Sequence, residues 1–459
     1  MPSFVRVFRS CISNLYHSLS LRIGAGDVRS HIESLTLFLF FVFLPLGTKK
    51  TLAVLVYPFG SKAFFLYAFD IALVILFGCW VLRKGWCHRT HDIPHKMLSL
   101  FVGAVVLSFL LAGRFHLISW YALIRLFEGM FCYYYLASHP TLTREYAFRA
   151  LLAGAFFEMW IGIAQFKLQH NIGLHALGET WFGDGISGTA TFHFGVDKIV
   201  RIPGTFLHPN ILGAFLFMSS CMALYFFVHS EKPWAARGWV VFYYGVNFLL
   251  LCTLSRSNIV TTLIVTGGYL GSLYAHHRMK VITIAVVWIL ILGTLWGMFG
   301  NILDARFVHS FDEFSYTNRV LYNEVGLSVI ASHPILGVGI GNFVDFAFSH
   351  TLFQAHGLDL PYLYQPVHNL YIFIAAETGV TGFLLFLAFL GTLIASEWRA
   401  VWHEPSRRVV LFIFVGFLAL AMIDHYFWDL EQGIVMFWMV LGFLVLKETP
   451  QKSLHRPRS

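Results

Sequence analysis

The sequence predicts an all-α fold: a polytopic membrane helical bundle of about twelve transmembrane helices with a large late loop outside the cytoplasm. Hydrophobic residues make up 57% of the 459 positions, charged residues make up 12%, and the mean hydropathy is +0.68. These values exceed those of soluble domains of this size. Apolar stretches near the ~20 residues that cross a bilayer recur from Leu35 to Leu446.

We expect one transmembrane domain over residues 33–446, with two long outer loops at about residues 169–206 and 300–367. The second loop is much less apolar than the rest of the chain, and it leads directly into the apolar run that follows His368. The predicted spans cover residues 33–47, 62–83, 97–113, 118–137, 146–168, 207–228, 237–253, 258–275, 280–299, 368–395, 408–424 and 431–446.

Residues 1–32 are basic and partly apolar, but they lack the apolar core and cleavage site of a signal peptide. We expect them to form a cytoplasmic segment at the membrane interface. Residues 447–459 are expected to be a cytoplasmic tail.

Basic residues indicate the orientation of the bundle, because cytoplasmic loops carry an excess of Lys and Arg. They concentrate in alternate loops, at Arg83, Lys84, Arg89, Arg144, Arg149, Lys232, Arg237, Arg278, Lys280, Arg399, Arg407 and Arg408. Both termini are therefore expected in the cytoplasm. Basic loops beside an anionic leaflet also explain the net charge of +8, so we expect membrane lipid and no nucleic acid as a partner.

His368 is the candidate catalytic residue, because it lies where the late loop meets the start of an apolar helix. Unpaired amides and the positive end of the helix dipole favour a neutral imidazole and a nearby anion, which suits a general base. The alternative is a histidine that only caps the helix. Asn369, Asp424 and His425 are candidates for lining the same cavity, since all three are expected at the outer surface.

A few arginines lie on the outer side of this topology, against the overall charge trend, and three of them are candidate site residues: Arg201, Arg256 and Arg319. A guanidinium group forms two-point hydrogen bonds with phosphate oxygens and keeps its charge in any environment. Three arginines and one base suit the displacement of a phosphate leaving group. The alternative for each is an arginine that anchors a helix end at the interface.

Other charged or glycine-rich patterns favour structural roles. The run HPILGVGIGNF lacks the strand-turn-helix context of a nucleotide site, so its glycines are expected in a turn or in close backbone packing. Arg125 and Glu128 are three residues apart and are expected to pair. Glu377 faces away from His368 on a straight helix and is expected to be a structural acid.

No metal or cofactor is expected. Cysteine and histidine gather in one short cytoplasmic loop, but their spacing matches no zinc pattern; these residues are Cys87, His88, His91 and His95.

The order of several motifs resembles the O-antigen ligase and polymerase superfamily. These motifs are RIPGTFLHPN, LSRS, SYTNR, HPILGVGIGNF and HNLYIFIAAETG, and they lie within residues 200–445. The resemblance implies a bacterial inner-membrane enzyme that acts outside the cytoplasm on a glycan carried by undecaprenyl pyrophosphate. It also implies that His368 activates an acceptor hydroxyl, that Arg319, Arg256 and Arg201 hold the pyrophosphate, and that direct attack inverts the anomeric carbon.

The acceptor is not determined by these motifs. A ligase transferring to lipid A-core is favoured, because the chain ends soon after its last predicted span and shows no added outer domain for engaging proteins. An O-antigen or exopolysaccharide polymerase and a protein O-oligosaccharyltransferase remain alternatives. A secondary transporter is the alternative that is not an enzyme, although no pair of related halves with broken helices is visible.

Overall fold

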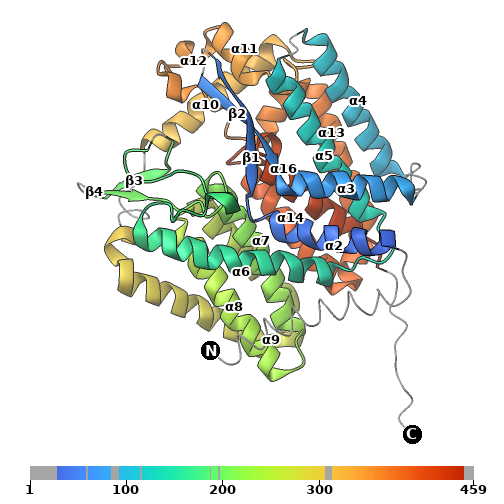
Figure 1. Ribbon diagram of the computed structural model, residues 1–459, viewed down its shortest axis with the longest axis vertical. Helices are drawn as coiled ribbons and strands as arrows, with labels where there is room; N and C mark the ends of the chain where they lie inside the picture. Colours follow the sequence, from blue (N-terminus) through green and yellow to red (C-terminus); the bar gives the residue numbers. More distant parts are fainter. Residues whose placement is uncertain are drawn as a thin grey trace.

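The computed structural model describes residues 28–57, 60–83, 92–113, 116–186, 188–194, 197–304 and 313–448. It is mainly helical, which agrees with the predicted class (Figure 1). The long helices are α2 (Val28–Phe43), α3 (Ala68–Leu82), α4 (Ile93–Leu111), α5 (Leu117–Ala137), α6 (Arg144–Leu168), α7 (Pro209–His229), α8 (Pro233–Cys252), α9 (Arg256–Asp304), α10 (Glu313–Ser332), α13 (Leu370–His403), α14 (Pro405–Ala421) and α16 (Glu431–Val445). Cys87, His88 and His91 lie outside the described residues.

Six of the described helices are long and apolar enough to cross a bilayer, so the chain has the features of a multi-pass membrane protein. They are Ile93–Leu111, Arg144–Leu168, Pro209–His229, Pro233–Cys252, Arg256–Met298 and Leu370–His403. Ala68–Leu82 and Glu431–Val445 are shorter apolar helices. The total of about twelve spans remains a prediction.

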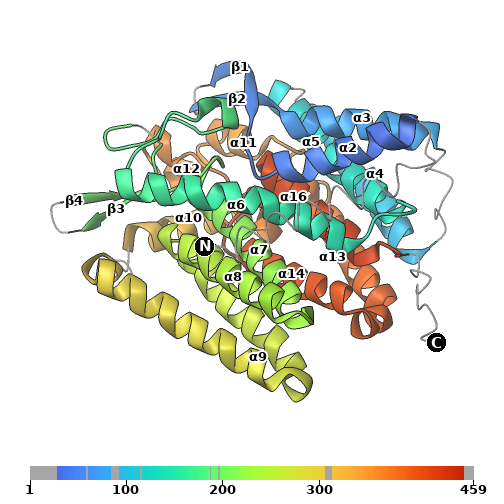
Figure 2. The same ribbon diagram turned by 60° about the horizontal axis from the view of Figure 1, so that its bottom comes forward.

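The helix α9 contains both of the spans predicted between residues 258 and 299, and it reverses direction between them. Asn258 lies beside the first turn of α7, and Lys280 contacts the carbonyl oxygen of Ser230, just beyond the far end of α7. Thr294 then accepts a hydrogen bond from Tyr244, halfway back along α8. These contacts require the chain to fold back near Lys280, and Figure 2 shows the second half of α9 along the edge of the molecule.

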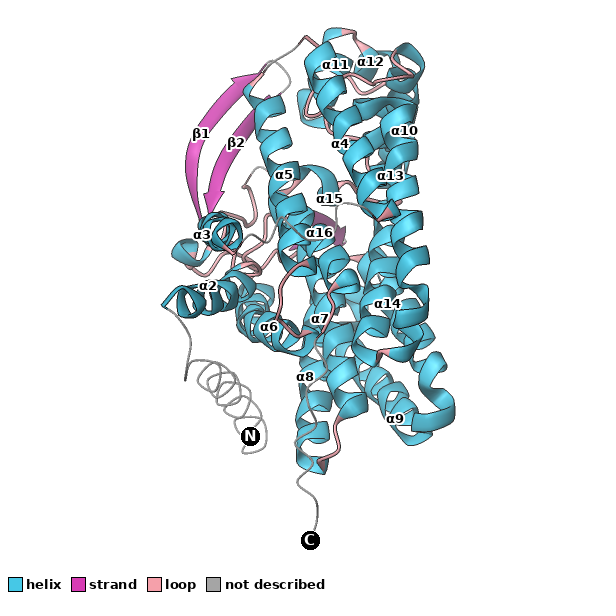
Figure 3. Ribbon diagram, turned by 90° about the vertical axis from the view of Figure 1, so that its right-hand side faces the viewer, coloured by secondary structure: helices cyan, strands magenta, loops and turns pink. Residues whose placement is uncertain are grey.

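A β-hairpin replaces the beginning of the second predicted span. Strand β1 (Lys49–Tyr57) pairs antiparallel with β2 (Gly60–Tyr67), so the helix expected from residue 62 begins only at Ala68. Aromatic and β-branched residues favour the extended conformation here, and the Asp70 carboxylate accepts a hydrogen bond from the Tyr67 amide at the helix start. The hairpin rises beside α5 toward the end of the bundle that carries α11 and α12 (Figure 3).

The two predicted outer loops are more ordered than their sequences suggest. The earlier one contains the 3-10 turn His175–Leu177 and a second hairpin of β3 (Thr191–Phe194) and β4 (Asp197–Val200). The late one contains α10, α11 (Phe343–Ser349), α12 (Leu352–Ala355) and the 3-10 turn Pro361–Leu363. Helix α10 packs against α13, so the late segment lies directly over the start of that helix.

The glycine-rich run fits the predicted close backbone packing. Gly337, Gly339 and Gly341 all have positive φ angles, and a Cβ on Gly337 would lie 2.4 Å from the Glu377 carbonyl carbon. The Gly339 amide donates to the Glu377 carbonyl oxygen at 2.9 Å, where α13 is kinked at Gly379. The Glu377 carboxylate accepts hydrogen bonds from the Gly341 amide at 2.8 Å and from Trp428 Nε1 at 2.7 Å. The predicted structural role of Glu377 agrees with these contacts.

The predicted pair of Arg125 and Glu128 is confirmed, with a distance of 2.5 Å between the guanidinium and carboxylate groups. Asp70 also approaches Arg125, at 2.8 Å. Arg125 therefore joins α3 to α5 through a buried ion network, in which each charge offsets part of the desolvation cost of the others.

We predict that Gly379→Ala destabilises the protein. Gly379 has φ 72° and ψ 171°, and an added Cβ would lie 2.1 Å from the carbonyl oxygen of Ile335. The strained backbone alone costs ~1–3 kcal/mol, so the midpoint of thermal unfolding in detergent should fall by a few degrees. Gly391→Ala is the matched control, because no atom lies within 4 Å of its added Cβ in the same helix. Equal midpoints for the two variants would contradict the packing of this kink.

Candidate functional site

His368 lies between the late loop and α13, two residues before the helix begins. The helix is capped by Asn369, whose Oδ1 accepts hydrogen bonds from the amides of Tyr371 and Ile372 at 3.0 and 3.3 Å. The capping role considered for His368 therefore belongs to Asn369, and the imidazole is available for other contacts.

The contacts of His368 define its tautomer. Its Nδ1 lies 3.1 Å from the carbonyl oxygen of Pro366, which can only accept a hydrogen bond, so Nδ1 carries the proton. The neutral ring then has its lone pair on Nε2. One face stacks on Tyr322, with ring centroids 5.3 Å apart, and His425 approaches edge-on at 4.8 Å.

The surroundings of His368 keep it neutral. Burial and the nearby His425 are the main causes that lower its pKa to about 4, and Arg319 acts in the same direction. A neutral imidazole at physiological pH can accept a proton. Arg319 lies on α10, three residues before Tyr322, and no hydrogen bond or ion pair of its side chain occurs within the described part of the chain.

His425 is held between two carboxylates in the segment after α14. Its Nδ1 lies 2.7 Å from Asp429, and its Nε2 lies 3.9 Å from Asp424. Burial opposes a charge on His425, but Asp429 and Asp424 outweigh it and raise the pKa of the imidazole. Burial would likewise raise the pKa of Asp424, but His425, His368 and His208 lower it to about 2. The arrangement is therefore an imidazole held between two carboxylates, which favour its protonated form.

A hydrogen-bonded network connects Asp424 to Arg201. Asn210 donates to Asp424 at 2.7 Å, and its Oδ1 accepts from Arg201 at 2.7 Å and from Ser255 at 3.0 Å. Sequence reasoning did not find Asn210 or Ser255 as site residues. The signal for Asn210 was available, because LHPN precedes an apolar run as PVHN does before α13.

His208 is a second buried histidine in this network. It begins α7 and accepts a hydrogen bond from the Asn210 amide at Nδ1, at 3.1 Å. Burial and then Arg201 lower its pKa to about 3.

Arg256 begins α9 and follows the tight turn that contains Leu254. Leu254 has a φ of 53°. This left-handed conformation raises the free energy of a residue with a side chain by ~1–3 kcal/mol, and such strained residues cluster at functional sites. The turn aims the Thr253 carbonyl oxygen at Arg201 Nε, at 3.2 Å, and brings Ser255 to Asn210. Arg256 is thus adjacent in sequence to the network.

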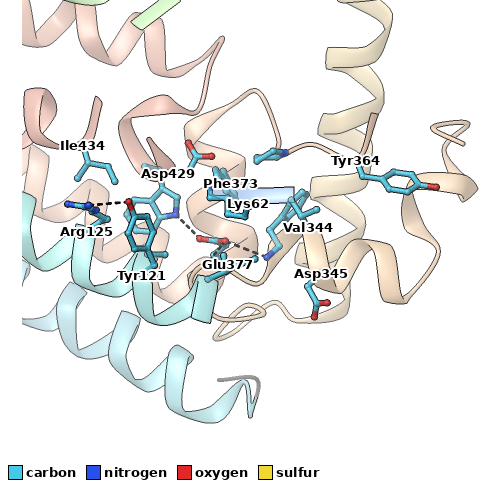
Figure 4. A pocket seen from close by; sticks show the side chains of 16 residues that line it. Lys62, Tyr121, Arg125, Val344, Asp345, Tyr364, Phe373, Glu377, Asp429 and Ile434 are labelled. Atoms are coloured by element: carbon cyan, nitrogen blue, oxygen red, sulfur yellow. Dashed lines mark hydrogen bonds between the residues drawn. The ribbon is translucent and has the colours of Figure 1, made fainter. Parts of the chain in front are cut away.

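A pocket of about 230 Å³ lies on the other side of this cluster (Figure 4). Pro366 and Asp429 line it, and these residues contact His368 and His425, respectively. Its remaining wall is formed by β2, α5, α11 and α13.

The cluster also has the composition of a metal site. His368, Asp424 and His425 each offer one ligand atom, and these atoms lie within 4.8 Å of one another. However, both Asp424 oxygens already accept hydrogen bonds, from Asn210 and from the His425 amide. The absence of a required metal remains a prediction.

Comparison with known proteins gives the class of this chain. The model of the O-antigen ligase family matches residues 239–387, a segment that includes Arg256, Arg319 and His368. This match confirms the predicted resemblance to the O-antigen ligase superfamily. No curated protein matches the chain. Over these residues the chain is similar to the O-antigen ligase family, which indicates a membrane enzyme of the ligase or polymerase type.

Proposed function

We propose that this protein is a metal-independent, inverting glycosyltransferase of the bacterial inner membrane. It transfers a glycan from undecaprenyl pyrophosphate to a sugar hydroxyl of lipid A-core, with its active site facing the periplasm. The observation that supports this proposal is the position of His368 two residues before α13, where its Nδ1 lies 3.1 Å from the Pro366 carbonyl oxygen and its ring lies beside His425 and Asp424.

His368 is the general base in the proposed reaction. The acceptor hydroxyl oxygen attacks the anomeric carbon, and its proton passes to Nε2. The bond between the anomeric carbon and the pyrophosphate oxygen breaks, and the pyrophosphate leaves with the electron pair on the face opposite to the nucleophile. The configuration of the anomeric carbon is therefore inverted. The proton on His368 then returns to solvent.

The arginines stabilise the leaving group. A pyrophosphate is already a good leaving group, so it needs charge stabilisation more than a proton donor. Arg319 is an electrostatic neighbour of His368, and Arg201 is connected to the cluster through Asn210 and Asp424. Arg256 follows Ser255 of the same network. Guanidinium groups from α9, α10 and the segment before α7 would contact the pyrophosphate from several sides.

The first prediction concerns the base. His368→Ala should lower kcat by at least ~10²-fold, because a positioned base contributes that much to proton transfer. Binding of the lipid-linked donor should persist, since the base acts in the transition state. The measurement is transfer by purified protein in proteoliposomes, with donor binding measured separately.

His333→Ala is the matched control, because His333 is exposed on the late segment, where its ring contacts Phe346 edge-on and hydrogen-bonds with Ser332. It should transfer at the wild-type rate. Near-normal turnover by His368→Ala would contradict the proposed base.

The arginines are tested by replacement with lysine. Arg319→Lys, Arg256→Lys and Arg201→Lys keep the charge but lose the planar two-point contact with phosphate. Each lost charged hydrogen bond is worth ~1.5–3 kcal/mol, so kcat/KM should fall by about tenfold or more. Arg149→Lys, in an exposed ion pair with Glu145, is the control and should be unaffected. Wild-type activity in all three site variants would exclude a pyrophosphate clamp made of these residues.

A deletion strain tests the acceptor. Loss of a ligase should leave long polymer on undecaprenyl pyrophosphate, whereas loss of a polymerase should leave single repeats attached to lipid A-core. We expect stranded polymer, detected by gel analysis of lipopolysaccharide and of the lipid-linked fraction. Single-repeat lipopolysaccharide would instead identify a polymerase with the same donor chemistry.

A further inference from the structure

The pocket beside Asp429 takes no part in the chemistry described so far. Its volume of about 230 Å³ is below the ~300–1,000 Å³ of sites for drug-sized ligands. It therefore has room for one sugar ring rather than an oligosaccharide. Its wall combines residues far apart in the sequence, among them Lys62 of β2, Val344 and Asp345 of α11, and Phe373 of α13.

His425 lies between this pocket and the network that holds Arg201. Its Nε2 edge faces Asp424, which leads through Asn210 to Arg201. Its Nδ1 edge faces Asp429, which lines the pocket. Nδ1 and Nε2 are on different edges of the imidazole ring. The pocket and the network that holds Arg201 therefore lie on different sides of His425. Pro366 brings the pocket wall to His368 itself.

The side chains of the pocket suit a neutral sugar. The pocket wall carries carboxylates, among them Asp345 and Asp429, as well as the cations Lys62 and Arg125. Buried aromatic rings of Phe373 and Trp428 provide apolar surface for the face of a sugar ring. Sugar hydroxyl groups can both donate to carboxylates and accept from an ammonium group.

Lys62 supplies that ammonium group. Among the described residues, no hydrogen bond or ion pair of its side chain occurs, although it is close enough to influence the pKa of His425. The hairpin replaces the beginning of the second predicted span. It therefore places a cation in the pocket wall, because Lys62 lies on β2. Figure 4 shows Lys62 beside Phe373 and Val344.

We infer that this pocket binds the neutral sugar ring that carries the acceptor hydroxyl. The inference rests on the proposed function. In an inverting displacement the nucleophile and the leaving group lie on opposite faces of the anomeric carbon. A pocket and an arginine cluster on different sides of the histidines satisfy that requirement.

The test measures transfer in proteoliposomes with purified undecaprenyl pyrophosphate-linked glycan and purified lipid A-core. Each substrate is varied while the other is saturating. Val344→Trp fills the pocket and should raise the KM for lipid A-core about tenfold or more, with the KM for the donor unchanged. Val54→Trp makes the same change on β1, where the side chain is 57% exposed and does not line the pocket, and should change neither KM.

Two polar variants keep the test valid if Val344→Trp does not fold. Lys62→Ala and Asp345→Asn should each raise the KM for lipid A-core by about two- to tenfold, the value of one net hydrogen bond. Direct binding of lipid A-core to inactive His368→Ala protein should weaken in parallel when either change is added.

The outcomes distinguish an error in the acceptor pocket from an error in the proposed function. If wild-type protein transfers glycan but the pocket variants leave the KM for lipid A-core unchanged, the acceptor pocket is wrong and the proposed function stands. If these variants raise the KM for the donor instead, the pocket holds the donor sugar and the inference is overturned. If wild-type protein transfers no glycan to lipid A-core, the proposed function fails and the inference fails with it.

Discussion

The contacts of His425 with two carboxylates are the interaction on which the rest of the site depends. Asp429 lies 2.7 Å from Nδ1 of the ring and Asp424 lies on its other edge, and both raise the pKa of the imidazole. A charged imidazole 4.8 Å from His368 disfavours a second positive charge there. The neutral state of His368 thus results from a neighbouring charge as well as from burial.

The contacts around His425 and Asp424 bring together residues from separate parts of the fold. Asp424 and Asp429 come from the segment between α14 and α16, and His368 comes from the start of α13. Asn210 at the start of α7 holds Asp424 and accepts from Arg201. The kinked α13 and the glycine run position the late segment over this junction. Each helix therefore contributes one of its ends to the site.

Apolar run length and the position of polar residues allowed much of the fold and part of the site to be predicted. α5 at Leu117–Ala137 was expected at 118–137, because crossing a bilayer requires a continuous apolar run. His368 was found because a polar residue at the start of such a run is unusual. The hairpin was missed because its apolar strand β2 continues without a break into the apolar helix α3.

Long-range contacts could not be predicted from the pattern of one sequence. Asn210 and Asp424 are 214 positions apart, and nothing local to either residue indicates that they bond. Lys62 resembled a residue within a span until the strand placed it at the pocket. The helices of the late segment carry few apolar residues in a continuous run, so hydropathy alone assigned that segment to a loop.

The pH dependence of kcat tests the central claim most directly. Below its pKa His368 is protonated and cannot accept a proton, so activity should be lost as the pH falls through that value. The account predicts an acidic limb with an apparent pKa near 4, and His425→Gln should move this limb upward because the neighbouring charge is removed. Circular dichroism at each pH would confirm that the protein stays folded. A wild-type limb near the ordinary histidine pKa of about 6.5, unmoved by His425→Gln, would contradict it.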